Sequence, residues 1–303
     1  MEEITFVTAF FDIGRENYSA VPRSNQKYYD YFKFWAGMQN YLIVYTDKDS
    51  EKQINEIRSE YNLGHRTKVI VIDDIRNIDP EIITRLNIIE RDEFFRAFRM
   101  RADATSNTAL YNYVMYLKSW FMNDAVQNNL VKKNVAWIDF GFNHGGKVFV
   151  NSNELNFEAV TTPIDKIQVY NKDEFDQRPI VQLVQCLEDC ILDPFIVMPK
   201  DLAKEFFLEN RKSIIALTDL GLMDDDQLIM MLSVRRRPEI FDLNQSDWFL
   251  PLKDLGGDHL TVKKGRPKSA LKNFLLHHYI KCISLKLRTF YMYRLGKFLF
   301  KEM

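Results

Sequence analysis

The chain has 303 residues, of which 46% are hydrophobic and 27% charged, and this composition indicates a globular protein with a large core. The 3 cysteines are too few for a disulfide framework and favour a reducing compartment. No secretory signal and no apolar run of membrane-spanning length is recognisable, so we expect a cytoplasmic protein. The net charge of −1 hides a basic segment at residues 261–303, with a charge of +10, and a remainder with −11.

Apolar, β-rich runs alternate with segments of helical length and period through the first half of the chain. The predicted strands are residues 4–11, 41–46, 68–72 and 135–138. The predicted helices are residues 24–38, 49–62, 79–95 and 108–130. Because such alternation is typical of parallel βαβ units, residues 1–140 are predicted to form a Rossmann-like, nucleotide-binding half.

The second half has a different pattern. Residues 146–197 contain shorter mixed runs, such as Lys147 to Val150, that predict antiparallel or edge strands. Residues 199–236 return to a helical period, with a predicted C-cap and restart at residues 219–222. A basic segment, 268–301, is also helical in period. Since no Pro/Gly-rich linker divides the chain, we expect one α/β domain with a mixed sheet over residues 1–260, whose acceptor half is 141–260. A basic helical appendage, 261–303, follows it.

Asp139 directly follows the predicted strand at 135–138, in Trp-Ile-Asp-Phe-Gly. Open α/β sheets bind ligands outside the carboxyl ends of their strands, so this carboxylate could hold a divalent cation between two phosphates. The structural alternative is a turn or helix cap before Gly141, since Asp is common at strand ends. The phosphate loops GxGxxG and GxxxxGK[ST] are both absent, which argues against a Rossmann dehydrogenase or a P-loop NTPase.

Other polar residues stand at places where chemistry is possible. His144 and His259 lie in glycine-containing loops and are further candidate metal ligands, although a structural role is the more ordinary alternative for each. Asp225 and Asp226 begin a predicted helix, where the helix dipole stabilises acidic side chains and an acid can cap the helix. One of them could instead be a general base. Lys118 is a solitary cation on an apolar, aromatic helix, where it either reaches solvent or offers its charge to a phosphate.

Several segments together resemble the bacterial HtrL/YibB family. They are residues 8–15 (TAFFDIGR), 28–35 (YYDYFKFW), 42–46 (LIVYT), 111–115 (YNYVM), 137–141 (WIDFG), 224–227 (DDDQ) and 237–241 (RPEIF). The family is similar to the GT-A glycosyltransferases of bacterial surface polysaccharide synthesis. The resemblance implies a nucleotide-sugar donor near Thr8, Phe10 and Arg15, and a metal-binding acid at Asp139. The usual Asp-x-Asp signature is incomplete here, because its third position is Gly141.

From these observations we expect a glycosyltransferase with a GT-A-like fold. The donor is expected to be a nucleotide sugar such as a UDP-sugar, and the acceptor a glycan or lipid-linked glycan. Lys118 would be a counter-charge for the diphosphate, and Mn²⁺ or Mg²⁺ would be held by Asp139 with His259 or His144, unless transfer is metal-independent. The alternatives are a nucleotidyltransferase and a non-catalytic binding protein that kept the fold.

The basic tail interleaves its cations with aromatic residues, which suits peripheral binding to the anionic inner leaflet of the membrane. Basic residues with aromatic ones also serve in nucleic-acid binding. We expect no nucleic-acid partner, because the acidic remainder of the chain would repel a phosphate backbone. A helix docked on that acidic body, or a dimer contact, is a third interpretation of the tail.

Overall fold

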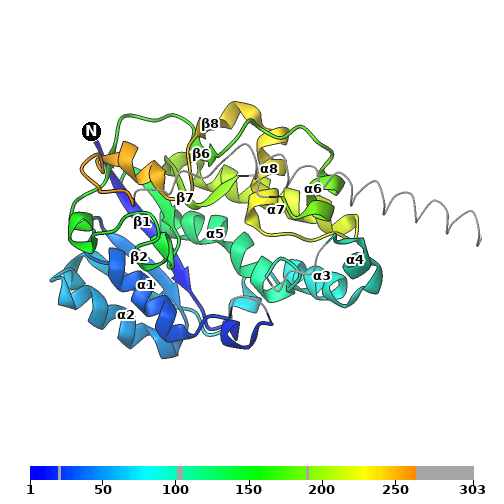
Figure 1. The fold of residues 1–303 in the computed structure, drawn as a ribbon, viewed down its shortest axis with the longest axis horizontal. Helices are drawn as coiled ribbons and strands as arrows, with labels where there is room; N and C mark the ends of the chain where they lie inside the picture. The colour runs from blue at the N-terminus through cyan, green and yellow to red at the C-terminus, as the bar shows by residue number, and fades with distance from the viewer. Residues whose placement is uncertain (20–21, 101–104, 189–190, 264–303) are drawn as a thin grey trace, which may run out of the picture. The chain divides into compact units, whose positions relative to one another are not determined.

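One mixed sheet with helices on both of its faces forms the centre of the structure (Figure 1). The computed structural model describes residues 1–19, 22–100, 105–188 and 191–263. The strands are β1 (Glu2–Phe10), β2 (Leu42–Thr46), β3 (Thr67–Val71), β4 (Asn134–Ile138), β5 (Val160–Thr161), β6 (Ile167–Asn171), β7 (Leu192–Pro199) and β8 (Phe241–Gln245). The α-helices are α1 (Asn25–Trp35), α2 (Lys48–Glu60), α3 (Pro80–Arg91), α4 (Glu93–Phe98), α5 (Ala109–Gln127), α6 (Ile180–Cys186), α7 (Ala203–Asp219) and α8 (Asp226–Arg236).

The strand order is β3-β2-β1-β4-β7-β6-β8, and the short β5 pairs with the start of β1. Strands β1 to β4 are mutually parallel, whereas β7 runs antiparallel to both β4 and β6. The start of β7 therefore lies at the edge of the sheet where β1 and β4 end. Backbone pairing continues past β4 at this edge, since the Asp139 N–H donates to the Pro194 carbonyl at 3.1 Å.

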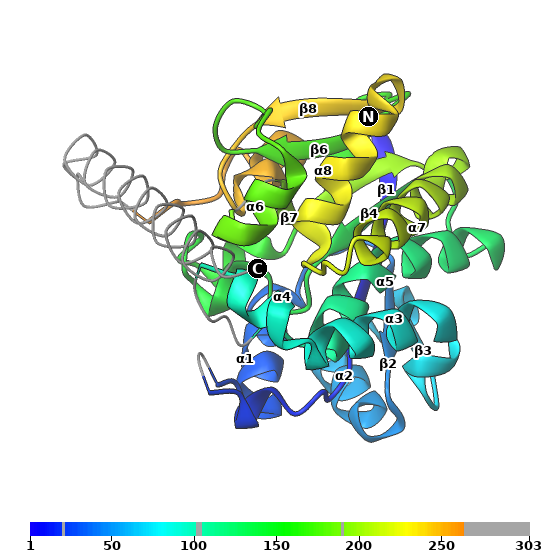
Figure 2. The ribbon, with the colours of Figure 1, turned by 90° about the vertical axis from the view of Figure 1, so that its right-hand side faces the viewer.

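Alternating side chains of the strands separate the core into two clusters. Phe6 of β1 faces a cluster that includes buried residues of α1 and α2, whereas the next residue, Val7, faces a cluster that includes buried residues of α3, α5, α7 and α8. These helices pack side by side in the order α3, α5, α7 and α8 (Figure 2). The sequence pattern predicts this arrangement, because strands covered on both faces read as continuous apolar runs.

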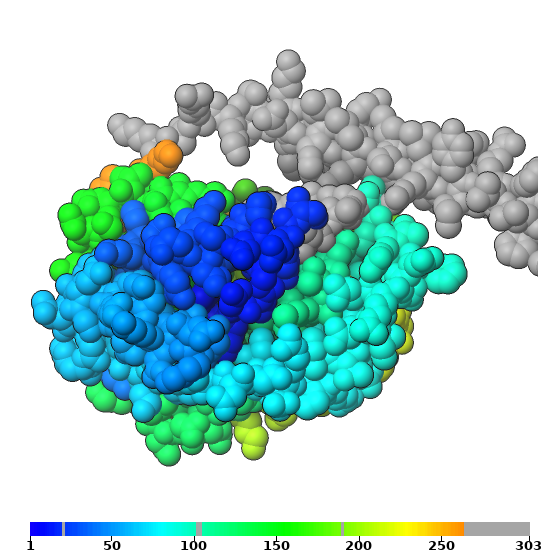
Figure 3. All heavy atoms as spheres, turned by 90° about the horizontal axis from the view of Figure 1, so that it is seen from below, coloured from blue at the N-terminus to red at the C-terminus, as the bar shows by residue number. Residues whose placement is uncertain are grey.

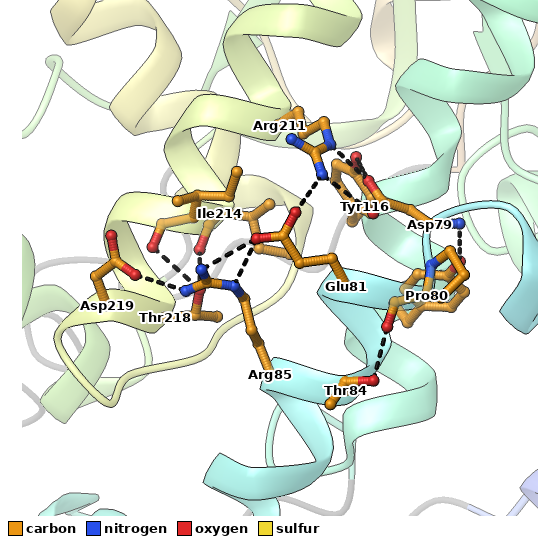
Figure 4. A network of polar contacts seen from close by, with 12 residues as sticks. Asp79, Pro80, Glu81, Thr84, Arg85, Tyr116, Arg211, Ile214, Thr218 and Asp219 are labelled. Carbon is orange, nitrogen blue, oxygen red and sulfur yellow. Dashed lines mark hydrogen bonds and ion pairs between the residues drawn. The ribbon is translucent and has the colours of Figure 1, made fainter.

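Polar contacts join three of these helices (Figure 4). Arg211 of α7 ion-pairs with Asp79, just before α3, and with Glu81 of α3, both at 2.7 Å. The Tyr116 hydroxyl of α5 donates to the Asp79 carboxylate at 3.0 Å. Asp79 is buried, so these two partners compensate a charge that would otherwise be expensive to desolvate.

The predicted α/β class with a mixed sheet is confirmed, with local differences. The predicted helix 79–95 is two helices, because Asp92 is extended and its side chain caps α4. The helical segment 199–236 is interrupted as predicted, at Gly221, which has φ +68° and lies between α7 and α8. The expected strand around Val150 is reduced to one bridge between Phe149 and Val262.

Residues Met1–Val262 form one compact unit. The predicted basic helix at 268–301 lies outside the described residues, and so does the expected membrane-binding role of that segment. Within the described ranges, no helix is both long enough and apolar enough to cross a membrane.

Candidate functional site

A pocket opens at the carboxyl ends of β1 and β4. Its walls combine aromatic side chains, including Phe10, Tyr28 and Tyr111, with charged ones, including Arg15 and Asp139. Figure 3 shows a face on which the segment after β1, in dark blue, borders the turquoise residues near the start of α5. The volume of the pocket is about 120 Å³, below the roughly 300–1,000 Å³ typical of ligand pockets, so it encloses only part of a nucleotide-sized ligand in this conformation.

Behind this pocket, the ammonium group of Lys118 is surrounded by carboxylates. Its Nζ lies 3.0 Å from Asp139 Oδ1, 2.8 Å from Asp193 Oδ2 and 2.8 Å from Asp226 Oδ2. The side chain of Lys118 is only 3% exposed, whereas that of Asp139 is 30% exposed and faces the pocket. We call Asp139, Asp193 and Asp226 the carboxylate cage. They come from the end of β4, the start of β7 and the start of α8.

The cage carries more negative charge than its single lysine neutralises. Burial alone would lower the pKa of Lys118, but the attraction of Asp139, Asp193 and Asp226 outweighs it and raises that pKa well above its ordinary value. Burial raises the pKa values of Asp193 and Asp226, against the opposing pull of Lys118. Burial and the neighbouring acids also raise the pKa of Asp225 well above its usual range. Acids whose protonated forms are favoured in this way are suited to proton transfer.

Asp139 is held in place from two sides. Its Oδ1 accepts a hydrogen bond from Trp137 Nε1 at 2.7 Å and contacts the Lys118 ammonium. The alternative that its side chain caps the following turn does not apply, because the turn Phe142–Gly145 has no side-chain cap hydrogen bond. Gly141 stands at the third position of the Asp-x-Asp signature, and a Cβ added there would lie 3.5 Å from Tyr31 and 3.6 Å from Tyr28.

The acids at the start of α8 have separate roles. Asp226 belongs to the carboxylate cage, whereas the Asp225 side chain caps α8 by accepting the Gln227 N–H at 3.2 Å. Asp224 is ion-paired with the buried Arg99 at 3.0 Å. The pocket is lined by Asp139 and Asp193, and neither of the two predicted catalytic acids, 225 and 226, is among its lining residues.

Arg15 is a buried cation without a polar partner for most of its guanidinium group. Its side chain lines the pocket and is 6% exposed, and its Nε and Nη1 have no hydrogen-bond partner among the described residues. The guanidinium lies over the rings of Tyr18 and Tyr111, 4.7 and 5.0 Å from their centroids. Buried donors of this kind require an acceptor, so the site has the chemistry of an anion subsite.

The other residues predicted to bind the donor differ in position. Phe10 lines the pocket and stacks on Phe140, with ring centroids 4.8 Å apart. The prediction for Thr8 is not supported, because Thr8 is fully buried within β1 and does not line the pocket. Lys118 contacts Asp139 and Asp193, which line the pocket, but its positive charge is neutralised by the carboxylate cage and is not available to a phosphate.

The two candidate histidine ligands lie in different places. His144 lines the pocket with Asp139, and burial, followed by repulsion from Arg23 and Lys147, lowers its pKa to about 4. His259 is exposed, contacts Phe157, and its Nε2 lies 2.9 Å from the Glu154 carbonyl oxygen.

His259 therefore lies near the amino ends of the parallel strands. Its neighbour Phe157 accepts the N–H of Gln39, shortly before β2, and β5 pairs with the first residues of β1. Asp139 is at the opposite, carboxyl end, so the structure does not bring Asp139 and His259 together as the proposed metal pair. As the described side chains stand, no three His, Cys, Asp or Glu residues could hold a metal ion together.

A divalent cation does not fit the centre of the carboxylate cage either, because the ammonium of Lys118 occupies that place. Asp193, the second acid of the cage, was not predicted from the sequence. The available signal was an acid two residues before the apolar run 195–197. It becomes informative only once β7 is known to run antiparallel beside β4, which brings the start of β7 to Asp139.

The fold and this pocket define an α/β protein with a charged site at the carboxyl ends of its parallel strands. The chain belongs to the HtrL_YibB family, described as "Bacterial protein of unknown function (HtrL_YibB)", which matches residues 2–253. It is 31% identical over 269 residues to protein HtrL of Escherichia coli (strain K12), covering 81% of this chain and 90% of HtrL. The resemblance to this family is therefore confirmed.

Among solved structures, the chain is similar to mouse xyloside xylosyltransferase 1 in its apo form. The TM-score is 0.44 at 10% sequence identity, and the match covers 84% of this chain and 93% of that chain. At that TM-score, the likeness carries no argument about what this chain does.

Proposed function

We propose that the protein is a glycosyltransferase that moves a sugar from a nucleoside diphosphate sugar to a hydroxyl group of a glycan acceptor. The observation that carries the proposal is Arg15, a buried guanidinium that lines a pocket at the carboxyl ends of β1 and β4. Its Nε and Nη1 have no acceptor in the part of the chain that the structure describes. A diphosphate supplies the acceptors that this group lacks, in the geometry that arginine prefers.

The remaining walls of the pocket suit the other parts of such a donor. Tyr28, Tyr111 and Phe10 provide aromatic surface for a base or a sugar ring. Arg23 also lines the pocket and adds a second cation for the phosphates. A donor that projects from the small enclosed volume would leave its sugar near Asp139, where an acceptor hydroxyl can approach from solvent.

Transfer in this site breaks the bond between the anomeric carbon and the diphosphate oxygen and forms a bond from that carbon to the acceptor oxygen. Arg15 stabilises the negative charge that develops on the departing diphosphate. In an inverting reaction, Asp139 accepts the proton of the acceptor hydroxyl, because it is the most exposed member of the carboxylate cage. Asp226, which shares Lys118 with this base, then supports it from behind rather than contacting the acceptor, and Asp225 keeps its role as the cap of α8.

The acceptor and the membrane association belong to the same proposal. A lipid-linked glycan would be reached at the inner leaflet if the basic segment 261–303, with its charge of +10, binds anionic lipid headgroups. Flotation with vesicles of phosphatidylglycerol tests this step. The full chain should float and a chain ending at residue 260 should not, whereas equal flotation of both would contradict membrane binding by the tail.

A panel of UDP-, GDP- and dTDP-sugars tests the enzyme itself, with thermal stabilisation as the measure of binding and release of the nucleoside diphosphate as the measure of turnover. Arg15→Met should weaken donor binding at least about tenfold, as expected for the loss of a charge-assisted hydrogen-bonding group. Asp139→Asn should still bind the donor but lower transfer by about 10²–10⁴-fold. Stabilisation without turnover would favour a binding protein, and no stabilisation by any donor would contradict the proposal.

A further inference from the structure

We infer that the ammonium group of Lys118 is the resident cation of the carboxylate cage and fills the place that a divalent metal ion would otherwise take. This inference concerns only which cation the cage holds, so it does not depend on the proposed function. Three carboxylate oxygens, one each from Asp139, Asp193 and Asp226, lie 2.8–3.0 Å from the same nitrogen atom. The ammonium group is a compact point charge, so it can attract all three carboxylates at once, and its contact with Asp193 is also a hydrogen bond.

The cage is built by the fold and is not a chance surface cluster. Its members come from β4, β7 and α8, which are far apart in the sequence, and the lysine comes from the middle of α5. Lys118 is the one charged side chain among the buried residues of α5, and 3% of it is exposed. A long, flexible side chain is buried on this helix only because the acids compensate the desolvation of its charge.

Asp226 gives a second and independent indication that the cage is a cation site. The residue is 5% exposed, and neither of its carboxylate oxygens has a hydrogen-bond partner among the described residues. Its Oδ2 lies 2.8 Å from Lys118 Nζ, but the contact is an ion pair without hydrogen-bond geometry. A carboxylate buried without hydrogen bonds depends on the cation alone, as the ligand of a metal ion does.

The dimensions of the cage explain how one cation can replace the other. Metal–oxygen distances for Mg²⁺ and Ca²⁺ are about 2.0–2.6 Å, compared with the observed nitrogen–oxygen distances of 2.8–3.0 Å. Removing the ammonium therefore leaves three hard oxygen ligands, each of which needs to move about 0.2–1.0 Å towards the centre of the cage to coordinate such an ion. With the ammonium present, a divalent cation is excluded both sterically and by like-charge repulsion.

The inference predicts a gain of metal binding on removal of the lysine. The probe is Mn²⁺ alone, titrated into the full chain and followed by the loss of the free-Mn²⁺ signal in electron paramagnetic resonance. The wild-type protein should not bind Mn²⁺ in the cage, and Lys118→Ala should bind one equivalent at least about tenfold more tightly. Mn²⁺ should also raise the melting temperature of Lys118→Ala and leave that of the wild type unchanged.

Two matched variants locate the binding. Lys118→Ala combined with Asp193→Asn should lose the gained site, because it lacks one of the three ligands. Lys133→Ala removes an exposed lysine that is paired with the single carboxylate of Glu2, so it should gain no Mn²⁺ site.

Three results would overturn the inference. The first is wild-type binding of Mn²⁺ that Asp139→Asn or Asp193→Asn abolishes, and the second is a Lys118→Ala protein that binds Mn²⁺ no better than the wild type. If Lys118→Ala does not fold by itself, Mn²⁺ should restore its folding or that of Lys118→Met. Failure of both variants to fold in Mn²⁺ would be the third contrary result.

Discussion

Replacing Arg15 with methionine separates binding from stability, because the native residue is suited to a ligand that the folded chain does not contain. Two of its guanidinium nitrogens, Nε and Nη1, are buried without acceptors among residues 1–19, 22–100, 105–188 and 191–263, and each unsatisfied donor costs about 1–3 kcal/mol. Methionine removes that penalty and keeps apolar contact with Tyr18 and Tyr111. It loses two cation–π contacts, worth about 0.5–1 kcal/mol each. The balance lies at about 0–5 kcal/mol in favour of Arg15→Met, so the variant should be at least as stable as the wild type.

The matched control is Arg58→Met. Arg58 is also fully buried, but its guanidinium donates to Thr67 Oγ1 and to the carbonyl groups of Ala36, Met38 and Asn40. Removing it leaves buried carbonyl groups unpaired, so we expect a loss of about 3 kcal/mol.

The assay is urea unfolding of both variants and the wild type, with and without a nucleoside diphosphate. Arg15→Met should be at least as stable as the wild type without ligand and should lose the stabilisation by ligand. A variant as unstable as Arg58→Met that still responds to the ligand would refute the anion-subsite argument.

Three further predictions concern charge in the fold. The pKa of His144 is lowered from 6.5 to about 4, so its neutral form stabilises the fold above pH 6.5 and this stability is lost as the pH falls towards 4. Between pH 6.5 and 4, His144→Gln should reduce the fall in the free energy of unfolding by about 1–2 kcal/mol, a value that allows for the partial exposure of the ring. An unchanged pH profile would contradict the lowered pKa. Arg211→Met leaves the buried Asp79 without its cation, so it should lower the free energy of unfolding, measured by urea denaturation, by about 2–4 kcal/mol. A loss below about 0.5 kcal/mol would show that the network in Figure 4 contributes little to stability. Asp193→Asn leaves Lys118 with two carboxylates and relieves the repulsion among the acids. It should therefore lower the free energy of unfolding at pH 8 by less than Lys118→Met does. The reverse order would contradict the excess of negative charge in the cage.

The fold class could be predicted because its determinants are local. Strands covered on both faces need continuous apolar runs, and the helices between them need an apolar period, so both leave a pattern along the chain. The carboxyl-end position of Asp139 follows from the same pattern, since the acid directly follows a buried strand. The break at Asp92 was not predicted, because a single residue ends a helix without disturbing the apolar pattern on either side. The break at Gly221 was predicted, because glycine is common where a helix ends.

The carboxylate cage could not be predicted in this way. Lys118 and Asp226 were both singled out as chemically active residues, but their pairing depends on where α5 and α8 pack against the sheet. Asp193 enters the site only because β7 pairs with β4, and the pattern that predicts antiparallel or edge strands over residues 146–197 does not say which of them lies beside β4.

The sequence by itself thus determined the alternating elements, the family and the acid that opens the site at Asp139. The tertiary structure decided which charges meet, because the energy of a buried charge depends on partners a few ångströms away and not on neighbours in the chain. It placed His259 at the far end of the strands and left Arg15 without acceptors for Nε and Nη1. It also surrounded Lys118 with three carboxylates, which changes the lysine from a free counter-charge for a phosphate into the cation of the site.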